Sequence, residues 1–230
     1  GRNVSSPERT ARTMNELQER SRIPLFIIAD QEGGMVARFR DPYVAFPSAM
    51  AIAATGDPTL AYRAARATAE QLRAVGVNFN FAPCVDVNNN PLNPIIGTRS
   101  YGDTPEQVVR FSAEAIRGYH DGGVLTSAKH FPGHGDTSVD SHLDLPVVDF
   151  PRDRIESMEM VPFQEAIRAG VATVMTTHIM FPAYDADVPA TMSAKIMTGL
   201  LRGQLGYGGV IVTDDLEMKG VEAKWGVVKA

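Results

Sequence analysis

Short runs with strand character alternate with longer amphipathic segments along the chain. The short runs predict strands over residues 24–30, 78–83, 124–130, 171–178 and 209–214. Apolar residues at helical spacing predict helices over residues 58–75, 104–120, 157–168 and 193–204. A first helix is expected to begin after Ser6, which is a typical capping residue followed by Pro7. This alternation predicts an α/β protein built from parallel β-α-β units.

Polar residues gather where the predicted strands end: Asp30, Lys129, His130, His178 and Asp214. In a (β/α)8 TIM-type barrel, reactive groups lie at the carboxyl ends of the strands, so this fold is favoured. A doubly wound open sheet is the alternative, although Gly33-Gly34 lacks the spacing of its phosphate loop. About five strands are visible, and a full barrel has eight. We therefore expect one domain over residues 1–230, a barrel incomplete at both termini.

Composition narrows the function classes without choosing among them. Hydrophobic residues make up 44% and charged residues 21%, as in ordinary globular domains. The net charge is -5 and no basic block is present, which argues against a nucleic-acid partner. No apolar run approaches the roughly 20 residues of a membrane span. Cys84 is the single cysteine, so no internal disulfide can form. No signal peptide is visible; the compartment stays open, with the cytoplasm slightly favoured over secretion or the cell surface.

Residues 129–146 form the segment richest in reactive side chains. They contain three of the five histidines, and Pro132, Gly133 and Gly135 exclude a helix, so a loop after a strand is expected. Within this loop, Asp140 and His142 can face each other across a turn. The carboxylate would then orient the imidazole as a general acid/base. A loop stabilised by Asx-turn hydrogen bonds is the structural alternative.

A metal site is a second interpretation of the same loop. His130, His134 and His142, with Asp136, offer zinc-type ligands. However, His130 and His134 are four residues apart without a helix that would align them, so we expect no metal and no cofactor.

Two adjacent acids end the last predicted strand. Neighbouring residues on an extended strand point to opposite sides, so one of Asp214 and Asp215 should face the barrel mouth and the other should turn away. The inward acid could be a nucleophile, as in retaining glycosidases. Helix capping is the alternative role. Both can hold, with Asp214 catalytic and Asp215 structural.

Further charged residues are candidates for ligand binding. Asp30, Arg38 and Arg99 would suit a polyhydroxylated ligand, although a surface ion pair is the commoner role of an arginine. Cys84 is expected to be a small buried residue and not a nucleophile. Asp86 is a candidate partner for an arginine.

Four segments together resemble glycoside hydrolase family 3, in particular its β-N-acetylglucosaminidase branch: residues 29–34 (ADQEGG) with Arg38, 129–137 (KHFPGHGDT), 140–142 (DSH) and 211–215 (IVTDD). The resemblance implies a (β/α)8 barrel and a retaining mechanism. Asp214 matches the family's nucleophile, and His142 with Asp140 matches its acid/base dyad. Positions that bind the sugar match Asp30, Arg38, Arg99, Lys129 and His130.

The implied substrate is a terminal, non-reducing, β-linked N-acetylglucosamine, from cell-wall fragments or chito-oligosaccharides. A phosphorylase or a β-glucosidase of the same family is the alternative, and a non-catalytic sugar-binding relative is a third possibility. The chain departs from the family pattern at two positions. Met35 stands where an arginine is expected, and Glu217 stands where a small residue is preferred.

Overall fold

The computed structural model describes residues 4–138 and 145–228, and its centre is a curled parallel sheet. The sheet contains β1 (Ile28–Ala29), β4 (Phe79–Asn80), β5 (Leu125–Phe131), β6 (Thr173–Thr176) and β7 (Val210–Thr213). These strands lie in the order β1-β4-β5-β6-β7, which is also their order along the chain. A doubly wound sheet reverses its order at a switch point, whereas a barrel does not. The predicted barrel-type fold is therefore confirmed over the strands described.

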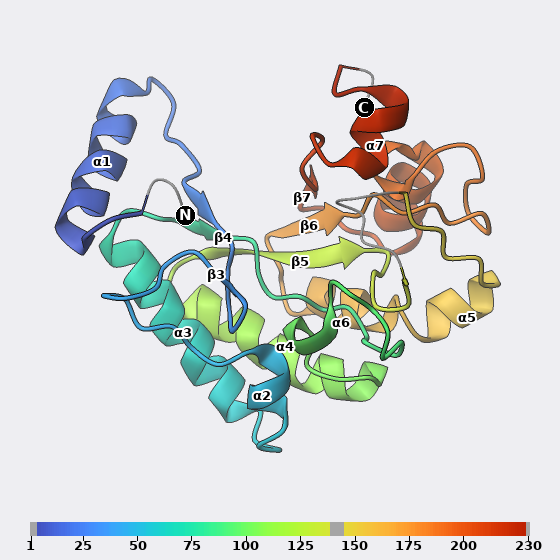
Figure 1. Cartoon of the computed structure of the whole chain (residues 1–230), viewed down its shortest axis with the longest axis horizontal. Helices are drawn as coiled ribbons and strands as arrows, with labels where there is room; N and C mark the ends of the chain where they lie inside the picture. The colour runs from blue at the N-terminus through green and yellow to red at the C-terminus, as the bar shows by residue number, and fades with distance from the viewer. Residues whose placement is uncertain (1–3, 139–144, 229–230) are drawn as a thin grey trace.

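Helices connect the strands and cover one side of the sheet. The longer ones are α1 (Pro7–Arg20), α3 (Thr59–Ala74), α4 (Pro105–Asp121) and α6 (Val161–Arg168). In Figure 1, α3, α4 and α6 lie below the strands, while α1 and α7 (Lys219–Trp225) lie at opposite sides of the view. Serine 6 caps α1 as predicted, because the Ser6 hydroxyl accepts a hydrogen bond from the Arg9 amide.

The hydrophobic core fills the space between the sheet and these helices. Its largest fully buried side chains include Leu72 of α3, Phe111 of α4, Phe131 of β5 and Phe163 of α6. Helices α3 and α4 approach closely because the facing residues are small. A Cβ at Gly118 would lie 2.3 Å from the carbonyl oxygen of Tyr62, so only glycine permits this packing.

Shorter elements complete the connections: α2 (Ala49–Ala53), α5 (Arg152–Ser157), the 3-10 turns η1 (Gly97–Arg99) and η2 (Ala190–Met192), the π-helical segment η3 (Lys195–Gln204), and an antiparallel hairpin of β2 (Gln31–Gly33) and β3 (Val36–Ala37). The sequence pattern did not reveal α2, α7 or the hairpin. Each is shorter than the window that hydrophobic periodicity needs.

The helix predicted over residues 157–168 is present as α6, which ends at Arg168 as predicted but begins four residues later, at Val161. The structure has α5 and α6 with a break at Met158. Pro162 lies in the first turn of α6, where a proline is tolerated; within a continuous helix it would clash with the preceding turn. The helix predicted over residues 193–204 begins at Lys195 and is π-helical.

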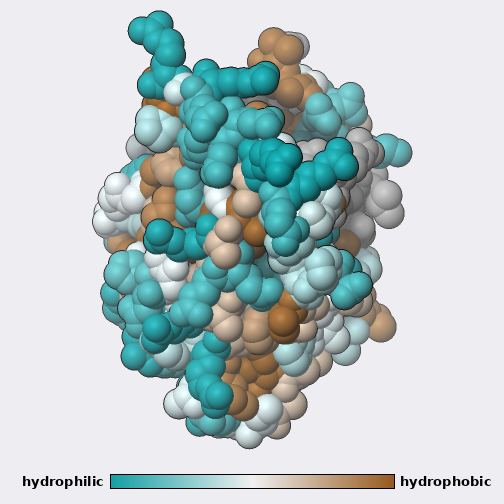
Figure 2. Space-filling model, turned by 90° about the vertical axis from the view of Figure 1, so that its left-hand side faces the viewer, coloured by the Kyte–Doolittle hydropathy of each residue, from teal (hydrophilic) through white to brown (hydrophobic). Residues whose placement is uncertain are grey.

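The apolar run at residues 24–30 is also more exposed than predicted. We expected a strand covered on both faces, but Phe26 is 65% and Ile28 43% exposed, and only two residues of the run form β1. Figure 2, which looks onto the side that carries α1, shows apolar surface between hydrophilic side chains. Within the described ranges, no helix is both long enough and apolar enough to cross a bilayer.

Candidate active site

A cleft of about 730 Å³ opens at the carboxyl ends of the strands. It collects residues from β5, β6 and β7, from the hairpin β2-β3 and from the loops that follow the strands, as expected for a barrel-type fold. Six of the eight residues selected from the sequence line it: Asp30, Arg38, Arg99, Lys129, His130 and Asp214. The other two, Asp140 and His142, lie outside the described residues.

Glu32 organises the basic residues of this cleft. Its carboxylate accepts two hydrogen bonds of 2.9 Å from the Arg99 guanidinium and lies 2.6 Å from the Lys129 ammonium. Its side chain is only 6% exposed. Sequence reasoning missed Glu32, although it lies two residues after Asp30 and therefore on the same side of an extended backbone.

Glu32, Lys129 and Arg99 each stabilise the charged form of the others. Burial alone would raise the pKa of Glu32, but Lys129 and Arg99 outweigh burial and lower it to about 2. Burial would likewise lower the pKa of Lys129, yet the carboxylates of Glu32 and Asp30 raise it. The pKa of Arg99 is raised by Glu32 against the effect of burial. The cleft therefore presents fixed charges near neutral pH.

Asp30 lies at the more open side of the same cluster. Its Oδ1 accepts a hydrogen bond of 3.1 Å from Lys129 Nζ, and its Oδ2 lies 3.8 Å from Arg38 Nη2. The Arg38 side chain is 48% exposed, so its ion pair contributes little to stability, and it remains accessible from the cleft.

Asp214 and Asp215 both border the cleft. That one of the two side chains faces the cleft and the other turns away stays a prediction. The strand ends at Thr213, and the backbone then turns. Asp215 Oδ1 accepts from the Glu217 amide at 2.9 Å, and the Asp215 carbonyl accepts from the Met218 amide. Asp215 thus shapes the turn that follows β7.

His178 supports this turn and does not line the cleft. It is buried, and its Nε2 donates to the carbonyl oxygen of Asp215 at 2.9 Å. Its Nδ1 lies 2.9 Å from the Thr191 hydroxyl. His178, one of the polar residues at the ends of the predicted strands, therefore stabilises the fold next to the cleft and does not face a ligand.

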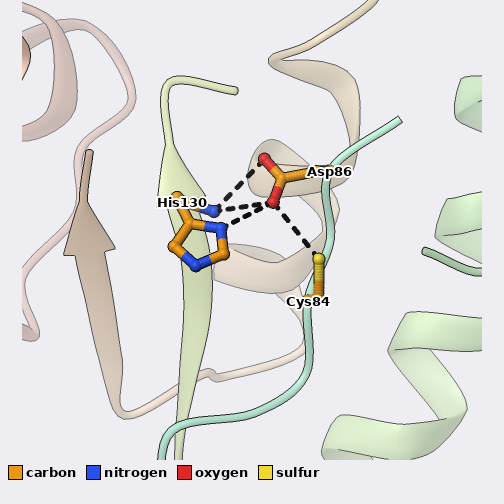
Figure 3. Close-up of side chains that lie close together, drawn as sticks. All are labelled: Cys84, Asp86 and His130. Carbon is orange, nitrogen blue, oxygen red and sulfur yellow. Dashed lines mark hydrogen bonds and ion pairs between the residues drawn. The ribbon is translucent and has the colours of Figure 1, made fainter. Parts of the chain in front are cut away.

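Asp86 is buried and contacts the cleft residue His130; among the described residues it forms no ion pair with an arginine, which was the anticipated partner. Its Oδ2 lies 2.7 Å from His130 Nδ1 and 3.2 Å from the Cys84 thiol. Figure 3 shows the Asp86 carboxylate between these two side chains. Cys84 is buried, as predicted, and burial together with the Asp86 charge raises the pKa of its thiol.

Cysteine, aspartate and histidine are all zinc-type ligands, and these three lie close together. Their separations from Asp86 are those of direct hydrogen bonds, however, and the carboxylate also accepts from the amides of His130 and His134. A metal ion would have to displace these bonds. The geometry fits a hydrogen-bond network better than a metal centre.

The histidines and the aspartate that formed the alternative metal set do not converge within the described residues. The Asp136 carboxylate lies 3.3 Å from Arg154 and accepts from the Asn89 amide at 3.0 Å. His134 Nδ1 lies 2.9 Å from the Thr137 hydroxyl. Asp136 is thus engaged by Arg154 and Asn89, and His142 lies outside the described ranges.

The segment from His134 to Thr137 is held tightly against the loop before η1. The Asn93 amide donates to the carbonyl oxygens of His134 and Gly135 at 2.8 and 3.0 Å. A Cβ at Gly135 would lie 1.7 Å from the Val87 carbonyl oxygen, which requires glycine there. Sequence reasoning did not select Asn93, although its place in the Asn- and Pro-rich segment 88–94 indicated a structured turn.

Fold and site together define a β/α-barrel domain with a charged cleft at the carboxyl ends of its strands. The whole chain, residues 1–230, matches the Glycosyl hydrolase family 3 N terminal domain. The chain therefore belongs to glycosyl hydrolase family 3, and the resemblance seen in its motifs is confirmed.

Curated and structural relatives agree with this assignment. The chain is 46% identical over 221 residues to "Beta-hexosaminidase A" of Pseudoalteromonas piscicida, covering 89% of this chain and 37% of that protein. It is 38% identical to a "Beta-hexosaminidase" of Xylella fastidiosa (strain M23), covering 99% of this chain and 69% of that protein. The chain thus spans between about a third and two thirds of these relatives.

Among solved structures, a glycoside hydrolase family 3 β-N-acetylglucosaminidase from Paenibacillus sp. str. FPU-7 superposes with a TM-score of 0.97 at 50% identity, covering 99% of this chain and 44% of that one. A β-glucoside phosphorylase superposes with a TM-score of 0.90 at 33% identity, covering 94% and 41%. The barrel-type architecture is therefore shared across relatives with different reported chemistry.

Proposed function

We propose that this domain carries the catalytic centre of a retaining, exo-acting β-N-acetylhexosaminidase. The substrate is a terminal, non-reducing, β-linked N-acetylglucosamine in cell-wall fragments or chito-oligosaccharides. The observation that carries the proposal is the composition of the cleft. It brings Asp214 together with the predicted sugar-binding residues Asp30, Arg99, Lys129 and His130. The relatives named β-hexosaminidase support the choice of sugar.

In the first step, the Asp214 carboxylate attacks the anomeric carbon while the bond from that carbon to the leaving oxygen breaks. The leaving oxygen takes a proton from His142, which Asp140 orients. In the second step, water attacks the anomeric carbon and gives its proton to the imidazole. The bond between Asp214 and the sugar breaks, and the product retains its configuration.

The protonation states of Glu32, His130 and His134 argue against these three residues as the proton donor. Glu32, with a pKa of about 2, is ionised near neutral pH and cannot act as an acid. Burial and the neighbouring Arg99 keep the pKa of His130 well below its usual range, and burial also lowers the pKa of His134. These imidazoles therefore carry no readily donated proton, which favours His142 for this role.

A slow 5-fluoro N-acetylglucosaminyl fluoride would test the nucleophile. We expect it to label the protein once, on the peptide that contains Asp214, as seen by mass spectrometry after digestion. The Asp215→Asn variant should still be labelled, whereas Asp214→Asn should not. A label on another residue, or turnover by an unlabelled Asp214→Ala variant, would contradict the assignment.

A phosphorylase is the second candidate, because one structural relative is a β-glucoside phosphorylase. In that reaction phosphate would replace water in the second step. Product analysis with and without phosphate separates the two. We expect free N-acetylglucosamine in both conditions, and a sugar 1-phosphate as the main product would favour the alternative.

A further inference from the structure

Asp86 is a fully buried carboxylate next to the cleft to which the proposed mechanism gives no role. Four donor groups surround it. Its Oδ1 accepts from the His134 amide at 2.7 Å, and the His130 amide lies 3.2 Å from both oxygens. Its Oδ2 accepts from the Cys84 thiol at 3.2 Å and faces His130 Nδ1 at 2.7 Å (Figure 3).

This arrangement requires an ionised carboxylate. A backbone amide can only donate, and the amides of His130 and His134 together engage both oxygens of Asp86. A proton on Oδ1 would face the His134 amide and lose that hydrogen bond. A proton on Oδ2 would have to be donated to His130 Nδ1, which would place the ring hydrogen on Nε2, facing the Arg99 donor. Asp86 is therefore an anion in the folded protein, even though burial raises its pKa.

The two ring nitrogens of His130 are consequently distinct. The Asp86 anion faces Nδ1, so Nδ1 carries the hydrogen. On the other edge of the ring, Arg99 Nη2 lies 3.3 Å from Nε2. A guanidinium can only donate, so Nε2 must accept. Arg99 and Asp86 together therefore select one neutral tautomer, with the hydrogen on Nδ1.

We propose that Asp86 is a positioning residue that holds His130 in its Nδ1–H form and leaves Nε2, beside Arg99, as an acceptor for one sugar hydroxyl. On binding, that hydroxyl would replace the direct contact between Arg99 and Nε2: it would donate to His130 Nε2 and accept from the Arg99 guanidinium, which satisfies both of its hydrogen-bonding roles. The identity of the sugar rests on the proposed function. The assignment of the tautomer does not.

The tautomer can be measured without turnover. In the protein labelled with ¹⁵N at histidine rings, the His130 signals are assigned by their loss in a His130→Gln variant. We expect a protonated Nδ1 and an unprotonated Nε2 from pH 5 to pH 8. A ring protonated at Nε2, or at both nitrogens within that range, would overturn the proposal.

The Asp86→Asn variant tests the consequence. Its carbonyl oxygen can still accept from the backbone amides, but its amide group then donates toward His130 and forces Nδ1 to accept. The ring hydrogen moves to Nε2, where it opposes Arg99 and the sugar hydroxyl. We expect about a 10- to 100-fold loss in kcat/KM, the cost of one mismatched buried hydrogen bond.

A series of monodeoxy N-acetylglucosaminides separates positioning from a merely structural effect. One deoxy substrate, which lacks the hydroxyl bound by Nε2, should be turned over equally by wild type and Asp86→Asn. An equal loss on every deoxy substrate would mean that Asp86 serves folding alone.

Asp185→Asn is the matched control, because Asp185 is also buried and accepts from the Ser193 hydroxyl at 2.7 Å, but it does not line the cleft. We expect this control to lower the melting temperature while leaving the His130 tautomer and kcat/KM unchanged. If Asp86→Asn does not fold, the ¹⁵N signals of the His130 ring in the wild-type protein still test the assignment of the tautomer. The expected tautomer in a protein inactive on N-acetylglucosaminides would support the role of Asp86 and refute the proposed function instead.

Discussion

Replacing Glu32 by glutamine removes the charge that holds Lys129 and Arg99 while keeping the shape of the side chain. The magnitude follows from the cleft. Its neighbours lower the pKa of Glu32 from the ordinary 4.5 to about 2. A shift of this size corresponds to about 3 kcal/mol in favour of the folded state. Loss of one partner from a buried ion pair costs about 3–5 kcal/mol, which agrees.

The pH dependence has a definite sign. A carboxyl group whose pKa is lowered by folding stabilises the fold fully above its ordinary pKa, and this contribution disappears as the pH falls toward the folded value. For Glu32 the window runs from pH 4.5 down to about 2. Glu32→Gln should therefore be much less stable than wild type at pH 7, and the gap should narrow below pH 4.

Thermal and urea denaturation at pH 7, 4 and 3 measure this difference. We expect the melting temperature of Glu32→Gln at pH 7 to fall by about 6 to 12 °C, given a domain of this size. Glu165→Gln is the control, because Glu165 pairs with Arg168 at 3.0 Å on the surface, where 70% of the arginine side chain is exposed. That variant should change stability by less than about 0.5 kcal/mol. A Glu32→Gln variant that melts within 2 °C of wild type at pH 7, or whose deficit is the same at every pH, would refute the reasoning.

Three further predictions concern the chemistry. Asp214→Ala should reduce kcat/KM by several orders of magnitude and Asp215→Asn far less, because only the first removes the proposed nucleophile; steady-state kinetics on an aryl N-acetylglucosaminide would reveal a reversal. His142→Ala should lose much more activity on a natural disaccharide than on a nitrophenyl glycoside, since only a poor leaving group needs the proton, and Asp140→Ala should show the same trend more weakly; equal losses on both substrates would assign the loop to binding or folding. Activity should survive prolonged chelation, and elemental analysis should find no stoichiometric zinc, whereas zinc lost together with activity would revive a metal site.

The sequence alone was enough to predict how strands and helices alternate along the chain. Strand and helix periodicity is local, because each apolar run or amphipathic segment has to bury its own face. The succession of strands and helices therefore followed from the alternation along the chain, whereas the choice of a barrel, which implies the order β1-β4-β5-β6-β7, rested on the polar residues at the strand ends. The clustering of Asp30, Lys129, His130 and Asp214 also followed, because the carboxyl ends of parallel strands meet at one edge.

Partners remote in the sequence could not be predicted, because nothing local distinguishes one buried charge from another. Glu32 meets Arg99, 67 residues away, and the two form an ion pair only because folding brings β2 next to η1. Asp86 meets His130 across 44 residues and not the arginine that charge alone suggested. The exposure of Phe26 depends equally on which surfaces surround it. Local pattern determines which face of each element is apolar, whereas the pairing of its polar groups is decided by long-range packing, which only the tertiary structure contains.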